Sequence, residues 1–288
     1  MNIFCNTYIQ KHLNLKYYCI VINYLRKYLY YKNHITRLTK FKNSIPKREF
    51  LKNKKKTFLI IKRDRWRGMF SNVHYTILQI IFAKKKRYIP FIDMKYFPTI
   101  YNEKNKIMNS YNSWEYYFNN FNNLNIDDIY KYYNYKFSDE KSFDTSKIKK
   151  IYYKEYKKIL SKILIKKNIK KKINQFIKKR FYKKKILGIH IRGSDQKTAA
   201  LHPYPPTLSQ MIKQADKLND KHNFDFFFLV TEEQNYYKKF KNYFGEKVIS
   251  YDHFRSKDDI FKVYPRKNHR YKLGFETIIN MILLSKTD

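Results

Sequence analysis

Apolar runs alternate with segments of helical spacing over most of the chain after residue 56. Five runs have the length and the branched or aromatic content typical of buried strands: 57–61, 88–93, 186–189, 224–231 and 247–251. Four segments repeat apolar residues every three to four positions and predict helices: 73–83, 208–219, 234–244 and 273–284. Strands that alternate with helices favour parallel sheets covered by helices, so we expect an α/β fold.

The order of these elements divides the chain into four parts. We expect a basic N-terminal extension at 1–56, which ends in a lysine-rich linker at 52–56. A first Rossmann-like half follows at 57–145, and a lysine-rich bridging helix at 146–185 leads to a second Rossmann-like half at 186–288. Two such halves predict a cleft between them.

Two segments differ from their surroundings. Residues 113–118 are mostly aromatic and predict a packed segment. The bridging helix repeats lysines around an apolar stripe, which comprises Ile148, Ile159, Ile163, Ile173, Phe176 and Ile177. A lysine-rich helix of this kind is typical of a solvated face.

Charge adds a question about partners. The 288 residues have a formal net charge of +40 and are 43% hydrophobic, which supports a folded core and excludes a disordered chain. Such a charge favours a phosphate-rich partner or an anionic membrane. An alternative is a biased genome, because Lys, Asn, Ile, Tyr and Phe are the residues of AT-rich codons. Since most basic residues are Lys, the composition argues against a dedicated nucleic-acid binder.

The sequence gives no sign of a zinc site, a disulfide framework or a membrane span. Cys5 and Cys19 belong to no metal-ligand pattern, which favours a reducing cytoplasm. The apolar stretch 17–22 is too short to span a bilayer and lacks a convincing signal-peptide cleavage pattern. Residues 8–32 are either a leader or a basic amphipathic helix on an anionic membrane. We therefore expect a cytoplasmic protein, with peripheral membrane contact as an open alternative.

The strongest candidate for chemistry follows the strand at 186–189. There the apolar run meets His190, Arg192, Gly193 and Asp195. Ligands bind beyond the carboxyl ends of parallel strands, and an imidazole, a guanidinium and a glycine suit a phosphate-bearing ligand. A buried Arg192 would need an anionic partner, which a diphosphate supplies. The plain alternatives are a structural His190 and an Asp195 that caps a turn.

The motifs around this cluster resemble the GDP-fucose-dependent fucosyltransferase superfamily. The cluster is followed by His202-Pro203, by a strand that ends in Thr231-Glu232-Glu233, and by a closing helix. The resemblance covers about residues 57–288. In the first half, a loop, a helix with His74 and a strand match the same fold, at 68–72, 73–83 and 89–93. The resemblance implies a GT-B-like architecture with an acceptor-side first half and a donor-binding second half.

The resemblance also implies roles for single residues. Arg192 would bind the donor diphosphate and stabilise the departing GDP, and Asp195 would orient the same loop as a second catalytic candidate. His190 would contact the guanosine. The further candidates for donor binding are Gly193, His202, Gly68, Phe70, Asn72, Thr231 and Asn280. The implied substrate is a GDP-sugar, and no metal or other cofactor is expected.

The sequence departs from the family pattern at several positions. Gly193 replaces a second arginine, and Asn280 stands where the α-1,6 enzymes carry an aspartate that reads guanine. The general-base glutamate has no counterpart, which leaves Asp195, Glu232 or Asp93 as substitutes. The family continues into a strand and a phosphate-binding turn where this sequence reaches Asp288, so we expect the second half to be incomplete.

Three functions stay open from the sequence alone. We expect a metal-independent, inverting glycosyltransferase that moves a sugar, fucose by the resemblance, from a GDP-sugar to a glycan acceptor. The first alternative is a truncated remnant without activity. The second is a protein that binds nucleic acid or another polyanion through its net charge of +40.

Overall fold

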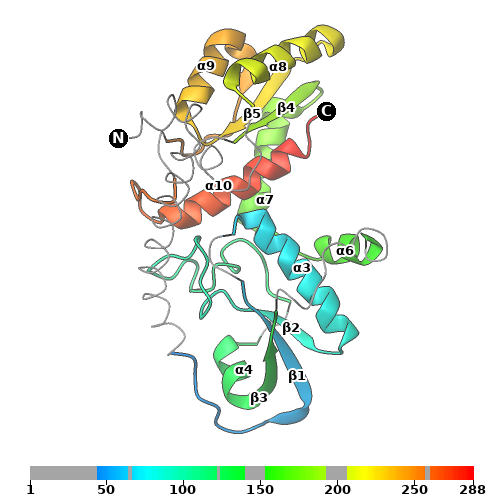
Figure 1. The fold of residues 1–288 in the computed structure, drawn as a ribbon, viewed down its shortest axis with the longest axis vertical. Helices are drawn as coiled ribbons and strands as arrows, with labels where there is room; N and C mark the ends of the chain where they lie inside the picture. Colours follow the sequence, from blue (N-terminus) through cyan, green and yellow to red (C-terminus); the bar gives the residue numbers. More distant parts are fainter. Residues whose placement is uncertain (1–43, 64–66, 122–123, 140–152, 193–205, 257–259) are drawn as a thin grey trace, which may run out of the picture. The chain divides into compact units, whose positions relative to one another are not determined.

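The computed structural model of the chain describes residues 44–63, 67–121, 124–139, 153–192, 206–256 and 260–288 (Figure 1). Residues 46–288 form one unit, and residues 1–45 belong to a separate one. The described part of residues 46–288 contains two three-stranded sheets and seven α-helices. Every strand pair is parallel, which confirms the expected α/β class.

The first sheet is built around β1 (Asn53–Ile61), which lies between β2 (Ile89–Ile92) and β3 (Tyr133–Phe137). Because both neighbours run parallel to β1, the carboxyl ends of all three strands share one edge. Helix α3 (Met69–Lys85) joins β1 to β2, and α4 (Ile126–Tyr132) directly precedes β3.

The second sheet has the order β4 (Ile186–Ile191), β5 (Phe226–Thr231) and β6 (Val248–Ile249). Helix α8 (Leu208–His222) joins β4 to β5. Helix α9 (Gln234–Phe244) and the short 3₁₀ helix η4 (Gly245–Lys247) join β5 to β6. Helix α9 ends at Gly245, whose φ of +59° favours glycine.

The last helix, α10 (His269–Leu284), leads the chain back to β4 (Figure 1). Asp288 N donates to Ile186 O over 3.0 Å, and Ile186 N donates to Asp288 Oδ2 over 2.7 Å. The chain at Asp288 therefore lies along the side of β4 that faces away from β5.

Two apolar cores hold these elements. The larger core takes residues from both sheets, for example Ile61 of β1, Phe228 of β5 and Ile279 of α10. The smaller core lies between the second sheet and helices α8 and α9, and it contains Phe227, Leu229 and Phe240. Alternate residues of β5 thus face the two cores, as expected for a strand covered on both faces.

The single bridging helix predicted at 146–185 is wrong in its described part. Helix α6 (Tyr153–Leu160), helix α7 (Lys167–Phe176) and a π-helical turn, η3 (Ile177–Phe181), stand there instead. Between α6 and α7 the backbone pairs with the aromatic segment, because Asn119 N donates to Leu164 O and Lys166 N donates to Tyr117 O. The branched side chains around Leu164 suit this extended pairing.

Two strand predictions also need correction. The linker at 52–56 is mostly strand, since β1 begins at Asn53 and its pairing with β3 is irregular between Asn53 and Thr57. Strand β3 was missed because its sequence, Tyr-Asn-Tyr-Lys-Phe, lacks branched residues and lies in a region rich in Asn and Tyr. The packed aromatic segment is confirmed, because Trp114, Tyr116, Tyr117 and Phe118 are buried.

None of the helices in the described part has the length and apolar character that a bilayer crossing requires.

Candidate functional site

The carboxyl end of β4 carries the two candidate residues of this strand that the structure describes. His190 and Arg192 are both exposed, while their neighbours Ile189 and Ile191 are buried. The protein around the imidazole and the charge of Arg192 both lower the pKa of His190 below its usual value. The imidazole is therefore neutral at pH 7 and can donate through one nitrogen and accept through the other.

Arg192 corrects one step of the sequence argument. We expected a buried guanidinium that needs an anionic partner, but Arg192 is exposed. Arg192 follows Ile191, the last residue of β4, and a position at the end of an apolar strand does not by itself bury a side chain. An anion would be attracted here by an accessible positive charge, not by the desolvation of a buried guanidinium.

The strand register places the end of β5 next to this pair. His190 is opposite Val230 and Ile191 is opposite Thr231, so Arg192 and Glu232 follow at the same edge. Thr231 is buried, and its hydroxyl accepts a hydrogen bond from Glu233 N over 3.2 Å. Thr231 thus shapes the start of α9, and its contact with a donor stays a prediction.

The start of α3 is connected to the same edge through Tyr101. The hydroxyl of Tyr101 accepts a hydrogen bond from Met69 N over 2.9 Å, in the first turn of α3. Burial raises the pKa of Tyr101 well above its usual value, and the charges of Arg192 and Glu232 also act on it. Tyr101 is therefore hydrogen-bonded to the start of α3 and is also influenced by the charges at the ends of β4 and β5.

The three candidates from this loop occupy different environments. Gly68 is exposed with an extended backbone, and a Cβ added there would meet nothing within 4 Å. Phe70 is 40% exposed, which is unusual for a phenylalanine and leaves its ring available to a ligand. Asn72 is buried; its amide nitrogen donates to Arg67 O over 3.3 Å, but its Oδ1 has no hydrogen-bond partner among the described residues.

Asn280 lies on α10 and is also buried, and in the part of the chain that the structure describes its Oδ1 has no hydrogen-bond partner. One turn earlier, Glu276 forms a bidentate ion pair with Arg266, at 2.6 and 2.7 Å, and accepts from Phe254 N. Arg266 also donates to the buried His269. This network fixes the connection between β6 and α10, and so fixes the position of the helix face that carries Asn280.

Gly193, Asp195 and His202 lie outside the described residues, so their predicted roles stay predictions.

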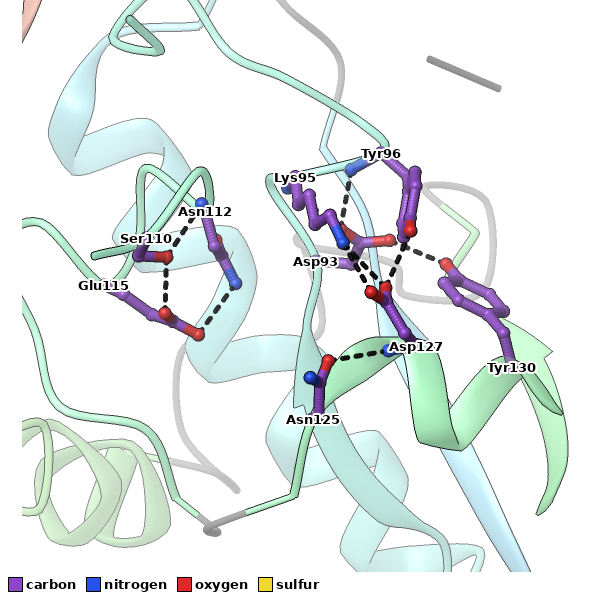
Figure 2. A network of polar contacts seen from close by, with 9 residues as sticks. All are labelled: Asp93, Lys95, Tyr96, Ser110, Asn112, Glu115, Asn125, Asp127 and Tyr130. Atoms are coloured by element: carbon purple, nitrogen blue, oxygen red, sulfur yellow. Dashed lines mark hydrogen bonds and ion pairs between the residues drawn. The ribbon is translucent and has the colours of Figure 1, made fainter. Parts of the chain in front are cut away.

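Asp93, one of the substitute bases considered from the sequence, has a structural role instead. Figure 2 shows its carboxylate at the end of β2, where Lys95 N and Tyr96 N donate to Oδ1 and the Tyr130 hydroxyl donates to Oδ2 over 2.6 Å. Asp93 is fully buried, and this burial raises its pKa from 3.8 to about 6. A carboxylate that no solvent or substrate reaches cannot take a proton from an acceptor.

The surrounding polar contacts extend this network to α4. Asp127 accepts from Lys95 Nζ over 2.7 Å and from the Tyr96 hydroxyl, and its backbone N–H donates to Asn125 at the helix start (Figure 2). The network connects the carboxyl end of β2 to the start of α4 and so fixes this edge of the first sheet.

Sequence reasoning missed a basic cluster after β6. The ring nitrogens of His253 lie 2.7 Å from Tyr251 O and 2.8 Å from Thr231 O, and the Arg255 guanidinium stacks 4.1 Å from the Tyr237 ring. The Nε of Arg255 is buried and has no hydrogen-bond partner within the described ranges. The available signal was the position of these residues just after the predicted strand 247–251, at the carboxyl edge of the sheet.

No family model matches the sequence, and no curated protein matches it. Solved structures do match. The chain aligns with NodZ α-1,6-fucosyltransferase co-crystallised with GDP at a TM-score of 0.55 and 14% identity, over 81% of this chain and 86% of that chain. It aligns with the fucosyltransferase NodZ from Bradyrhizobium at a TM-score of 0.52 and 14% identity, over 81% and 87% of the two chains. The chain has the fold of the NodZ fucosyltransferases.

The likeness to NodZ confirms the GT-B-like architecture expected from the sequence. A NodZ crystal soaked with GDP-fucose also matches, at a TM-score of 0.51 and 13% identity, over 81% of this chain and 86% of that one. In the NodZ-like fold of this chain, the described side chains contain no group of three His, Cys, Asp or Glu that could hold a metal ion. A reaction without a metal stays a prediction.

Proposed function

We propose that the chain binds a GDP-sugar at the carboxyl ends of β4 and β5 and transfers the sugar to a glycan acceptor. The NodZ-like fold supports this proposal at the level of a glycosyltransferase. NodZ was crystallised with GDP and soaked with GDP-fucose, so fucose is the first sugar to test.

The observation that carries the proposal is the exposure of both Arg192 and His190 at the carboxyl end of β4. A guanidinium binds a diphosphate through two parallel hydrogen bonds. Its positive charge then stabilises the negative charge that develops on GDP as it leaves. A neutral imidazole next to it can hydrogen-bond to a base or ribose without adding charge.

The proposed reaction inverts the configuration at the sugar carbon. An acceptor hydroxyl attacks C1 of the sugar from the side opposite GDP, and the bond between C1 and the phosphate oxygen breaks. The bonding electrons leave with GDP, and the hydroxyl proton passes to a carboxylate. Of the three carboxylates considered, Asp93 is buried, Asp195 lies outside the described residues, and Glu232 is partly exposed beside Thr231. We therefore propose Glu232 as the first base to test.

Titration calorimetry tests the proposal with three ligands: GDP, GDP-fucose and a random oligonucleotide. We expect saturable binding of GDP and GDP-fucose that persists at 0.15 M salt, about the physiological ionic strength. Binding of the oligonucleotide alone, with a steep loss of affinity in salt, would contradict the proposal and favour a polyanion-binding protein.

The Arg192→Ala variant tests the site. We expect its GDP affinity to fall by at least about 100-fold, because a charge-assisted bidentate contact is lost. Arg192→Lys keeps the positive charge but not the bidentate geometry of the guanidinium. Its loss of GDP affinity should therefore lie between those of the unmodified chain and the Arg192→Ala variant. Arg180→Ala, which removes an exposed arginine from η3, is the matched control and should bind GDP normally. Unchanged GDP affinity in the Arg192→Ala variant would refute the assignment.

A further inference from the structure

Helix α7 presents a stripe of lysines on the side opposite its buried residues. Lys167, Lys170 and Lys171 of α7 and Lys178 of the adjoining η3 recur at helical spacing and are exposed, while Ile169 and Ile173 on the other side are buried. Asn174 and Gln175, which are also exposed, lie on the same side of the helix as these lysines. Among the described residues, none of the four lysines forms an ion pair.

The charge of this region exceeds what solubility requires. Between Tyr153 and Lys185 the sequence has fifteen basic residues and a single acidic one, Glu155. Like charges this close repel one another and destabilise the folded state unless an anionic partner covers them. The stripe therefore fits a surface of negative charge.

Exposed apolar side chains flank the stripe in the sequence on both sides. Leu160, the last residue of α6, is 46% exposed, Leu164, between α6 and α7, is 59% exposed, and Tyr182, directly after η3, is 67% exposed. Leucine and tyrosine at the edge of a lysine surface match the interfacial region of a bilayer, where lysines meet headgroups and apolar groups enter the acyl boundary. Phosphate contacts of a nucleic acid make no use of such leucines.

The excess of lysine over arginine in this region also favours an anionic membrane over a nucleic acid. Only one of the fifteen basic residues, Arg180, is an arginine. Base and phosphate recognition in nucleic acids favours the planar fork of arginine, whereas lysine suffices for attraction to an anionic lipid surface. We propose that the α7 lysine stripe, with Leu160, Leu164 and Tyr182, docks the protein on a membrane rich in anionic lipid. This surface is separate from the proposed GDP-sugar site and does not depend on it.

Co-sedimentation with vesicles tests the docking surface. The two vesicle types are pure phosphatidylcholine and phosphatidylcholine with about 30% phosphatidylserine, at about 0.15 M salt. We expect the full chain to bind the anionic vesicles and not the neutral ones. No binding to the anionic vesicles would overturn the proposal.

A matched pair of charge variants locates the surface. The first variant is K167Q/K170Q/K171Q/K178Q. The second removes the same charge from exposed lysines of α8 and α9, as K213Q/K217Q/K238Q/K239Q. We expect vesicle affinity to fall by at least about 100-fold in the first variant and by less than about tenfold in the second. Equal losses would show a diffuse effect of net charge and overturn the proposal.

The leucines distinguish a bilayer from a nucleic acid. L160S/L164S should weaken vesicle binding by about tenfold and leave binding of an oligonucleotide unchanged. The control M108S/F121S removes two other exposed apolar side chains and should leave vesicle binding unchanged. If L160S/L164S binds vesicles like the unmodified chain, while the lysine variant loses both ligands, the stripe is a polyanion site and the membrane proposal fails. Thermal melting checks that each variant is folded.

Discussion

At the scale of single residues, accessibility separates the carboxylates and cations that can do chemistry from those that hold the fold. Arg192 follows the last residue of β4 and is exposed, whereas Asp93 follows the last residue of β2 and is fully buried. Both sit in equivalent places in their sheets. Asp93 is buried together with Tyr96, whose backbone N–H donates to its carboxylate, and with Tyr130 of α4, whose hydroxyl also donates to it.

The raised pKa of Asp93 predicts a pH-dependent stability. The pKa is about 6 in the folded chain against an ordinary value of 3.8, so the folded state binds the proton more tightly than the unfolded state. Its contribution is therefore most favourable below about pH 4 and is lost as the pH rises to about 6, by up to about 3 kcal/mol.

Asp93→Asn tests this expectation, because an amide keeps the acceptor for Lys95 N and Tyr96 N but does not titrate. Urea unfolding of both proteins between pH 4 and 7 should show a stability difference that changes up to about pH 6 and is constant above it. A difference that stays constant over the whole range would contradict the assigned pKa.

The sequence was enough to select candidate site residues, but it was not enough to predict how each of them is surrounded. The motif at 190–195 and the strand before it pointed to β4 and its end without a structure. The burial of side chains just beyond a strand could not be predicted, because it depends on which other segments cover the strand end. This is why Arg192 was expected to be buried and Asp93 was kept as a candidate base.

At the scale of elements, short apolar runs predicted strands correctly, whereas the lysine-rich sequence at 146–185 did not predict its secondary structure. The runs at 57–61 and 224–231 became β1 and β5, since a strand buried on both faces needs a continuous apolar sequence. The helix expected at 146–185 failed because isoleucines among lysines fit both a helix and an extended segment. Pairing with the aromatic segment at residues 117–119 decided between the two, and that contact is not visible in local sequence.

Helix α8 offers a test of how one element is fixed. Thr207 and Gln210 form a capping box: Gln210 N donates to Thr207 Oγ1 over 3.2 Å, and Thr207 N donates to Gln210 Oε1 over 2.8 Å. Thr207→Ala should lower the free energy of unfolding by about 1 kcal/mol and speed hydrogen exchange in the first turn of α8. Ser209→Ala, at an exposed position in the same turn, should cause neither change.

At the scale of the whole described unit, one core serves both sheets. Residues of β1, α3, β5 and α10 belong to the same apolar cluster, so the two sheets should unfold together. The two halves could be predicted from the sequence, because hydrophobic periodicity shows which residues of an element face a core. Their common core could not be predicted, because periodicity does not show which elements those residues pack against.

At Gly274 of α10 the shared core leaves no room for a side chain. A Cβ at Gly274 would lie 2.2 Å from the Tyr117 hydroxyl and 2.9 Å from Met69 Cε. Gly274→Ala should therefore lower the free energy of unfolding by about 1–3 kcal/mol and shift one common transition of both sheets. Urea unfolding, followed by circular dichroism and by tryptophan fluorescence, measures this.

Gly68→Ala is the matched control, because an added Cβ meets nothing there. Its stability should change by less than about 0.5 kcal/mol. Two separate transitions in the Gly274→Ala variant, or equal losses in both variants, would show that the two sheets do not share a core.

The central place of β1 has a consequence for synthesis on the ribosome. Both strands that pair with β1 follow it in sequence, and β3 ends at Phe137, 76 residues after Ile61. At about 5–20 residues per second, the nascent strand waits roughly 4–15 seconds for its second neighbour. During that time Phe58–Ile61, almost fully buried in the folded chain, is open to other nascent chains. The lysines at 54–56 and the pair Lys62–Arg63 flank this run, and charged residues at such positions oppose the aggregation of an exposed apolar segment.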